Sequence, residues 1–250
     1  MTRAQLIQHV ALRMDEVSPD ITIANLAVDG SDSNPLYTLI DGLVDGGALE
    51  LFSVAPYWRL PQTEFTYSAT ASANQIIVEA LPDALGDRTS SGNGSTETVT
   101  ARKIIRLKVP DDFLRVAEIN CTDFLRPITE VVTEISEAGR RQHNRALMGK
   151  ESKPVGVLSH GVWNSAQARE IDCYSLSNGT SVTASNDTIV ASYIAKPAMP
   201  LSGSLDSIES VVPPVLIPAL EWLIAARTFG ARGDADHAAI CQQNAQNVLV

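Results

Sequence analysis

The chain has 250 residues, of which 44% are hydrophobic and 19% charged, and this ordinary globular composition excludes disorder along its whole length. The formal net charge is −10 at pH 7. Such a charge argues against a protein whose main function is to bind the outside of nucleic acid, because such binding neutralises phosphates with clustered Lys and Arg. The three cysteines, Cys121, Cys173 and Cys241, have no CxxC spacing and predict neither a disulfide framework nor a zinc site.

The charge is unevenly distributed along the sequence. Residues 1–100 hold 4 basic and 13 acidic side chains, whereas residues 101–150 hold 10 basic and 7 acidic ones. This polarity fits either separate solvated faces or complementary charge between neighbouring copies of the chain.

The first residues predict an amphipathic helix from Thr2 to Met14. Thr2 and Gln5 have capping-box spacing, and the apolar residues that follow recur at helical intervals. The stretch lacks the apolar run and the small-residue cleavage site of a secretory signal, so we expect it to belong to the fold.

A second helix is predicted from Pro35 to Phe52. Asn34 before Pro35 is a favourable helix start, and Leu36, Leu39, Ile40, Leu43 and Val44 form an apolar stripe. The pair Gly46-Gly47 predicts a break in this helix before a further turn. The helical N-terminal part should end near Pro56.

The middle of the chain is rich in β-prone runs separated by turn residues. Six strands are predicted: QIIVE at Gln75, RKIIRLKV at Arg102, FLRVAEI at Phe113, GVLSHGVW at Gly156, REIDCYSL at Arg169 and TIVASYIA at Thr188. Residues 87–98, DRTSSGNGSTET, contain no large apolar side chain and predict a mobile loop or arm. Residues 129–148 have helical composition with a basic second half, and we expect one inserted helix there.

The C-terminal region predicts two helices. Pro213, Pro214 and Pro218 confine the start of the first one, which should run to about Phe229 and be buried on most sides. A membrane span is disfavoured, because three prolines, Glu221 and Arg227 lie within its limits. The segment GDADH allows two interpretations. The weaker is a metal site at Asp234, Asp236 and His237, and the stronger is that Asp234 caps a second helix.

No catalytic motif is predicted. Ser159 and His160 are adjacent on an expected strand, so their side chains point to opposite faces and cannot easily share a proton, with or without Asp172. Gly149-Lys150 lacks the following Ser or Thr of a phosphate-binding loop. We therefore expect a protein that is not an enzyme and that uses no cofactor and no metal.

Together these elements predict an α+β fold. Residues 1–55 and 205–250 should form a helical bundle, and residues 56–204 a β-rich domain with a sheet or small sandwich, the loop 87–98 and the inserted helix about 129–148.

Six sequence motifs resemble, in their order, the head-to-tail adaptor proteins of short-tailed bacteriophages, and most of all ring proteins of the crAss-like group. They are KVPDDFLRVAEI from Lys108, FLRPITEV from Phe124, GRRQHN from Gly139, KPVGVL from Lys153, SYIAKP from Ser192 and PALEWLIAARTFGARGD from Pro218. The similarity covers the region from Arg102 to the C-terminus, with the N-terminal helices also in keeping.

The resemblance implies a structural virion protein at the head-tail junction, made in the cytoplasm of a bacterial host. Such a protein assembles with other copies of itself, commonly twelve, into a ring that contacts the portal protein and the next tail ring or tail protein. Genomic DNA passes through the lumen without specific binding, and no membrane span is implied. An acidic wall suits this duct, because like charge prevents DNA from adhering.

Two groups of residues are candidates for subunit or portal contacts. The apolar C-terminal helix requires more cover than a small bundle offers, and the basic helix could oppose the acidic N-terminal part of a neighbouring copy or be a solvated face. The candidates are Leu220, Trp222, Leu223, Ile224 and Phe229 in the first group, and Arg140, Arg141 and Arg145 in the second.

Two other classes of function stay open. The first is a non-enzymatic binding module whose β-rich domain recognises saccharide or protein through Tyr57, Trp58 and Trp163, although aromatic residues make up only 5% of the chain. The second, and weaker, is a hydrolase that uses Ser159 or His160.

Overall fold

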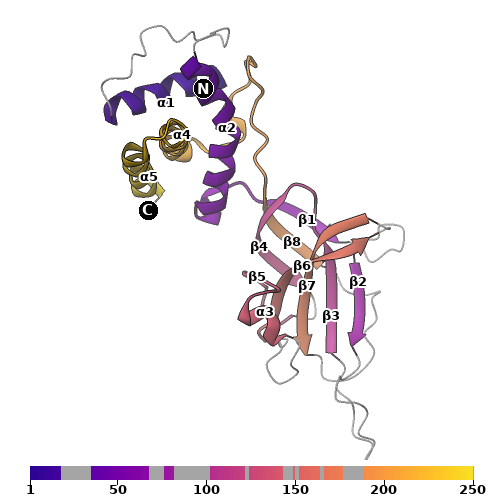
Figure 1. The fold of residues 1–250 in the computed structure, drawn as a ribbon. Coiled ribbons are helices and arrows are strands. Elements are labelled where there is room, and N and C mark those ends of the chain that lie inside the picture. Colours follow the sequence, from indigo (N-terminus) through magenta and orange to yellow (C-terminus); the bar gives the residue numbers. More distant parts are fainter. Residues whose placement is uncertain are drawn as a thin grey trace, which may run out of the picture. The chain divides into compact units, whose positions relative to one another are not determined.

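The computed structural model describes residues 1–17, 35–67, 76–81, 102–121, 124–142, 149, 152–163, 166–176 and 189–249 (Figure 1). Helices at both ends of the chain and a β-rich middle confirm the α+β fold class. The chain divides into two compact units, a helical unit of residues 1–61 with 194–250 and a β unit of residues 62–193. The sequence had placed these boundaries after residues 55 and 204.

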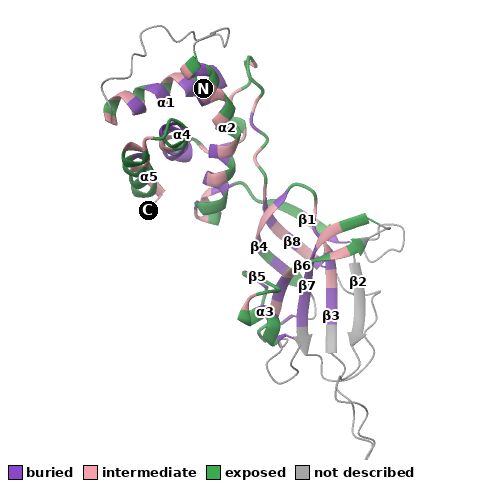
Figure 2. Cartoon of the chain, viewed as in Figure 1, coloured by how far each residue is buried: buried purple, intermediate pink, exposed green. Residues whose placement is uncertain are grey.

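Within its described residues, the helical unit has four helices: α1 (Arg3–Val17), α2 (Pro35–Val54), α4 (Ile217–Ala231) and α5 (Ala235–Leu249). Three short 3-10 turns accompany them, η1 (Tyr57–Arg59), η2 (Ile208–Ser210) and η3 (Pro214–Leu216). Helix α4 contacts all three other helices and contributes buried residues on several sides, so it is the centre of the unit (Figures 1 and 2).

The start of α1 has the predicted capping box. The Thr2 backbone N–H donates to Gln5 Oε1 at 2.8 Å, and the Gln5 N–H donates to Thr2 Oγ1 at 3.3 Å. Two orphan amides of the first turn are thereby satisfied. The helix then buries Leu6, Ile7 and Val10 at 0% exposure, on the face that the sequence period indicated.

The predicted break of the second helix at Gly46-Gly47 is wrong, because α2 continues through both glycines to Val54. A Cβ atom on Gly47 would lie 2.5 Å from Cγ1 of Ile224, and one on Gly46 would lie 3.0 Å from the Arg227 guanidinium. The two glycines therefore allow α4 to approach α2 closely, and packing between the helices offsets their low helix propensity.

Both predictions about the C-terminal helices are confirmed. Pro214 begins η3, which leads directly into α4. Gly233, with φ of +82°, ends the helix in a Schellman motif: its N–H donates to Gly230 O, and the Asp234 N–H donates to Phe229 O, both at 3.0 Å. Asp234 then caps α5, since its Oδ1 accepts from the His237 N–H at 3.2 Å. Within the described ranges, no helix is long and apolar enough to cross a membrane.

The described residues of the β unit form two sheets. Three strands, β1 (Thr63–Tyr67), β8 (Ile189–Ala195) and β4 (Phe113–Cys121), form one sheet in the order β1-β8-β4. The other has the order β2-β3-β7-β6-β5, with β2 (Ile76–Leu81), β3 (Arg102–Lys108), β7 (Ala166–Leu176), β6 (Val155–Trp163) and β5 (Val131–Thr133). The pairs from β2 to β6 are antiparallel, and β5 is parallel to β6.

The two sheets face each other. In β3 and β7, Ile105 pairs with Cys173 and Leu107 with Ile171, so these side chains share one face of the five-stranded sheet. Tyr67 Oη of β1 donates to Lys108 O at the end of β3 at 2.9 Å, and the Arg169 guanidinium of β7 lies 5.5 Å from the centre of the Phe113 ring of β4. This face therefore packs on the three-stranded sheet as a small sandwich.

All six predicted strands are present, but the sequence missed β1 and β5. The inserted helix predicted about 129–148 is wrong at its start, where the β-branched residues Val131, Val132 and Thr133 extend along β6 instead. Helix α3 is only Glu137–Arg141, capped by Ser136, whose Oγ accepts from the Gly139 N–H at 3.1 Å. Residues 143–148 and the loop 87–98 lie outside the described residues.

Replacing Gly47 by Ala should destabilise the helical unit by about 1–3 kcal/mol, because the added methyl group would overlap Ile224. The matched control is Gly42→Ala in the same helix, where a Cβ has no neighbour within 4 Å. That change should stabilise by roughly 0.5–1 kcal/mol, through helix propensity alone. Urea unfolding of both variants measures the difference. Equal effects of the two substitutions would contradict the close approach of α2 and α4.

Candidate assembly surfaces

The predicted contact residues on α4 belong mainly to the core of the helical unit. Leu220 and Ile224 are 0% exposed, and Leu223 and Phe229 are 4% and 2% exposed. Helices α1, α2 and α5 of the same chain supply the cover that the sequence analysis sought in a neighbouring copy. Trp222 alone of the five is partly exposed, and the Arg13 guanidinium lies 5.2 Å from its ring centre.

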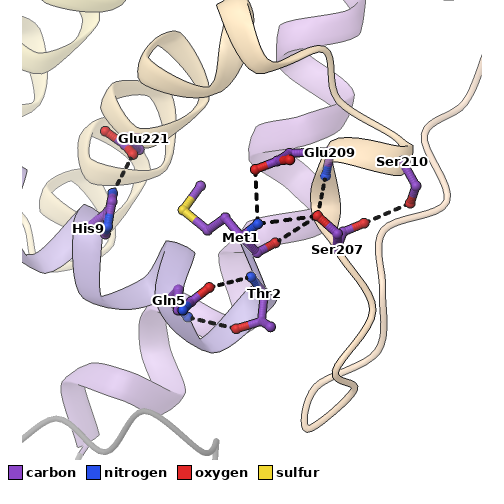
Figure 3. A network of polar contacts seen from close by, with 8 residues as sticks. All are labelled: Met1, Thr2, Gln5, His9, Ser207, Glu209, Ser210 and Glu221. Carbon is purple, nitrogen blue, oxygen red and sulfur yellow. Dashed lines mark hydrogen bonds and ion pairs between the residues drawn. The ribbon is translucent and has the colours of Figure 1, made fainter.

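Beside Trp222, the otherwise apolar α4 buries one carboxylate. Glu221 is 3% exposed, and its two oxygens are bound by two residues of α1. Arg13 Nε donates to Oε2 at 3.0 Å. His9 Nδ1 lies 3.0 Å from Oε1 (Figure 3). Arg13 also reaches Glu16 at 3.1 Å on the surface. This pairing fixes the register of α1 on α4, because a one-turn slip would leave a buried charge unpaired.

Replacing Glu221 by Gln should lower the free energy of unfolding by about 1–3 kcal/mol, since Arg13 and His9 lose a charged acceptor in a buried place. Glu16→Gln is the control, because it removes the other carboxylate bound to Arg13. The Glu16 side chain is 53% exposed. The expected cost there is at most about 0.5 kcal/mol. Chemical denaturation of both variants provides the comparison, and a larger loss for Glu16→Gln would refute the register role.

The segment that enters η2 is fastened to the N-terminal residues. The Met1 amino group is 2.9 Å from Glu209 Oε1 and 3.2 Å from Ser207 Oγ (Figure 3). The Arg3 guanidinium, which also binds Asp41 Oδ1 at 2.6 Å, donates to Pro200 O at 3.0 Å. Residues 200 and 207 are thus both held in place on the helical unit.

Between these two anchors, residues 201–204 form a tight turn. The Ser204 N–H donates to Leu201 O at 3.0 Å, and Gly203 has φ of +79°, as the third position of a type II turn requires. Leu201 and Leu205, on either side of it, are 80% and 89% exposed. We call residues 201–206 the leucine turn. The sequence analysis missed it, although LSGSL after a proline is a turn signal flanked by two apolar residues.

A pocket of about 290 Å³, open to solvent, lies on the β unit between edge strand β4 and edge strand β5. We call it the β4–β5 groove. Two backbone hydrogen bonds between Ile119 and Ile128, at 2.8 and 2.9 Å, join the end of β4 to the segment that leads into β5. Its lining is mostly apolar, with one cation and one carboxylate: Phe113, Leu114, Arg115, Val116, Thr129, Glu130, Val131 and Leu158. Burial lowers the pKa of Arg115, so its charge is partly desolvated.

The basic contact candidates lie on α3. Arg140 and Arg141 are exposed, Arg141 forms an ion pair with Glu137 one turn earlier, and Arg140 Nε donates to Ile135 O at 3.0 Å. Arg145 lies outside the described residues. Two basic side chains therefore remain at the surface, one of them locally neutralised.

The polar residues weighed as a nucleophile set are not arranged as a triad. Ser159 Oγ donates to Glu170 Oε1 at 3.2 Å across β6 and β7, whereas His160 is exposed. Asp172, 6% exposed, accepts from Arg106 Nε at 3.1 Å. Burial raises the pKa of Asp172 to about 6, Arg106 opposes the rise, and the Glu170 and Glu134 carboxylates add to it.

This carboxyl should make the stability of the β unit depend on pH. Between about pH 4 and 6 the folded state holds a proton that the unfolded state has released, so the contribution of Asp172 to stability grows as pH falls through this window. Asp172→Asn should therefore gain stability over the parent chain at about pH 7 and lose that advantage near pH 4.5. Thermal unfolding at both pH values measures it, with Glu118→Gln on the exposed side of β4 as control. A constant difference across the range would contradict the assignment.

Two of the three aromatic residues proposed for a binding module belong to the helical unit and not to the β unit. Tyr57 and Trp58 belong to η1 of the helical unit, with ring centres 5.3 Å apart in an edge-to-face arrangement. They are 47% and 70% exposed. Arg59 beside them donates to Leu249 O at the end of α5, at 3.2 Å. The Trp163 side chain lies outside the described residues.

In GDADH, the carboxylate of Asp234 is occupied as a cap. It binds the N–H of His237 and, at 2.6 Å, its Nδ1, and these bonds lower the pKa of Asp234. Asp236 is in the first turn of α5. Over the parts of the chain that are described, no group of three or more potential metal ligands converges.

No protein family matches the chain, and no curated protein matches it.

Proposed function

We propose that this chain is a structural, non-enzymatic virion protein of a short-tailed bacteriophage, which forms a ring between the portal and the tail and continues the DNA channel. The observation that carries the proposal is the combination of a helical bundle made from both chain ends with a β-rich unit. Head-to-tail adaptor proteins, which the motifs from Lys108 to Asp234 resemble, are similar in combining a helical bundle from both chain ends with a β-rich part.

The charge of the two units supports this function. The helical unit holds 6 basic and 13 acidic residues, a net charge of −7, whereas the β unit holds 13 and 16, a net charge of −3. A duct must let DNA slide without adhering, and a wall of the same sign as the phosphates prevents contact within the range of electrostatic screening. The helical unit carries the larger negative charge, so of the two units it is better suited to line the DNA channel.

Exposed apolar side chains on both units provide surfaces for assembly. Leu201 and Leu205 protrude from the helical unit, and Leu125 and Ile135 of the β unit are 75% and 78% exposed. A ring is built from heterologous contacts, in which one surface of each copy meets a different surface of the next. Two units with different apolar features supply the two surfaces that such a contact needs.

Negative-stain microscopy of the purified chain, alone and mixed with the portal protein of the same virus, tests the proposal. We expect rings, or a disc added to one end of the portal. The matched control is an unrelated portal of similar size, which should gain no disc. Chains that remain monomeric and ignore their own portal would overturn the function.

A binding module is the second candidate, and the exposed Tyr57–Trp58 pair is the observation that favours it. An edge-to-face aromatic pair at the surface is a suitable platform for a sugar ring or an apolar peptide side chain. Tryptophan fluorescence during titration with saccharides, compared between the parent chain and Trp58→Ala, distinguishes this function from ring assembly. A fluorescence change that is lost in the variant would favour the module.

A further inference from the structure

The leucine turn has the properties of a preformed contact element. Its conformation is fixed by the Ser204–Leu201 backbone bond and by Ser204 Oγ, which donates to Asp206 Oδ2 at 2.8 Å and accepts from the Asp206 N–H at 3.1 Å. Its flanks are fastened through Pro200 and Ser207 to the N-terminal residues. Such a turn loses little conformational entropy on binding, so the burial of its two leucines would contribute nearly in full to affinity.

Exposed leucines on a rigid turn serve no purpose within the described helical unit. Leu201 and Leu205 leave 80% and 89% of their surface in water, although the buried core of the same unit lies a few residues away at Ile208, which is 0% exposed. Two such side chains on one short turn form a small apolar patch, whose burial against a partner would favour association.

The β4–β5 groove offers a receptor of matching chemistry. Its volume of about 290 Å³ exceeds that of a leucine side chain, and Leu114, Val116 and Leu158 provide an apolar wall. Its two sides are edge strands, because β4 ends the three-stranded sheet and β5 ends the five-stranded one. Edges of this kind are covered in stable proteins or used for pairing with another chain.

Charge selects the occupant of the groove. Arg115 contributes a cation to the lining and Glu130 a carboxylate, but Glu130 is exposed and solvated, whereas Arg115 is partly buried. Asp206, which directly follows Leu205, carries a carboxylate on an exposed residue of the leucine turn. A partly desolvated guanidinium gains more from a carboxylate than an exposed one does, because the local dielectric constant is lower. A leucine followed by an aspartate is thus the chemistry that the groove would recognise.

We propose that the leucine turn of one copy docks in the β4–β5 groove of a neighbouring copy, with Leu205 in the pocket and Asp206 paired to Arg115. The contact rests on the proposed ring function and specifies its subunit interface. It is heterologous, since turn and groove are different surfaces, and each copy can give its turn to one neighbour and receive the turn of another.

Sedimentation or mass photometry over a range of concentrations tests the contact. Leu205→Asp should weaken self-association by about tenfold or more, because it removes the apolar anchor and adds a further carboxylate beside Asp206 in the groove. Val215→Asp is the control: Val215 is 63% exposed on the same unit and belongs to η3, outside the leucine turn, so its replacement should leave assembly unchanged. Circular dichroism checks that both variants are folded.

A charge exchange tests the ion pair. Asp206→Arg and Arg115→Asp should each reduce self-association, and a mixture of the two single variants should restore it, because each can then pair with the other. If Arg115→Asp fails to fold, crosslinking replaces it: Leu205→Cys chains mixed with Thr129→Cys chains should give a dimer with a short bismaleimide reagent. Neither variant alone should yield that product, which also controls for the native cysteines.

Three results would overturn the contact: Leu205→Asp assembling like the parent chain, no crosslink in the mixture, or a parent chain that stays monomeric at every concentration. None of these decides the proposed function, which is tested separately by the disc on the portal. Rings that persist in the Leu205→Asp variant would leave the adaptor function in place and assign the subunit contact to another surface.

Discussion

The close packing of α4 against α1, α2 and α5 is the constraint on which the helical unit depends. Helix α4 buries side chains on several sides, so each neighbour must meet it with a surface of suitable shape. On α2 this surface is a pair of glycines, and on α1 it is the pair of His9 and Arg13 that satisfies Glu221. The first contact sets the distance between helices, and the second sets their register.

Sequence reasoning succeeded where a local physical signal is strong. The capping box at Thr2, the proline-limited start of α4 and the Asp234 cap each depend on residues within one helical turn, and all are present. The β-prone runs gave six strands for the same reason, since alternation and β-branched residues are local properties. The α+β class follows from these elements alone.

The wrong predictions concern segments whose structure depends on contacts with residues far away in the sequence. Gly46-Gly47 looks like a helix breaker until Ile224, far along the sequence, is seen to occupy the space that the missing side chain leaves. Val131–Thr133 became a strand because β6 offers an edge, which composition cannot reveal. The candidate assembly surfaces show the same limit of sequence-based prediction. Periodicity indicated that α4 is buried on most sides, but not that helices of its own chain cover it. The leucine turn was not predicted, because the exposure of its leucines cannot be inferred from sequence.

The late position of α4 in the sequence determines the order in which the two units can fold during synthesis. Helices α1 and α2 have little core of their own, since the residues that they pack against lie beyond residue 216. The whole β unit is synthesised in the interval, and its strands pair among themselves. During synthesis the β unit should therefore fold first. Until α4 has been synthesised, the apolar faces of α1 and α2 stay exposed to solvent. The leucine turn, anchored on Met1 and Arg3, becomes rigid only in the final step, so a half-made chain cannot present the finished element to its neighbours.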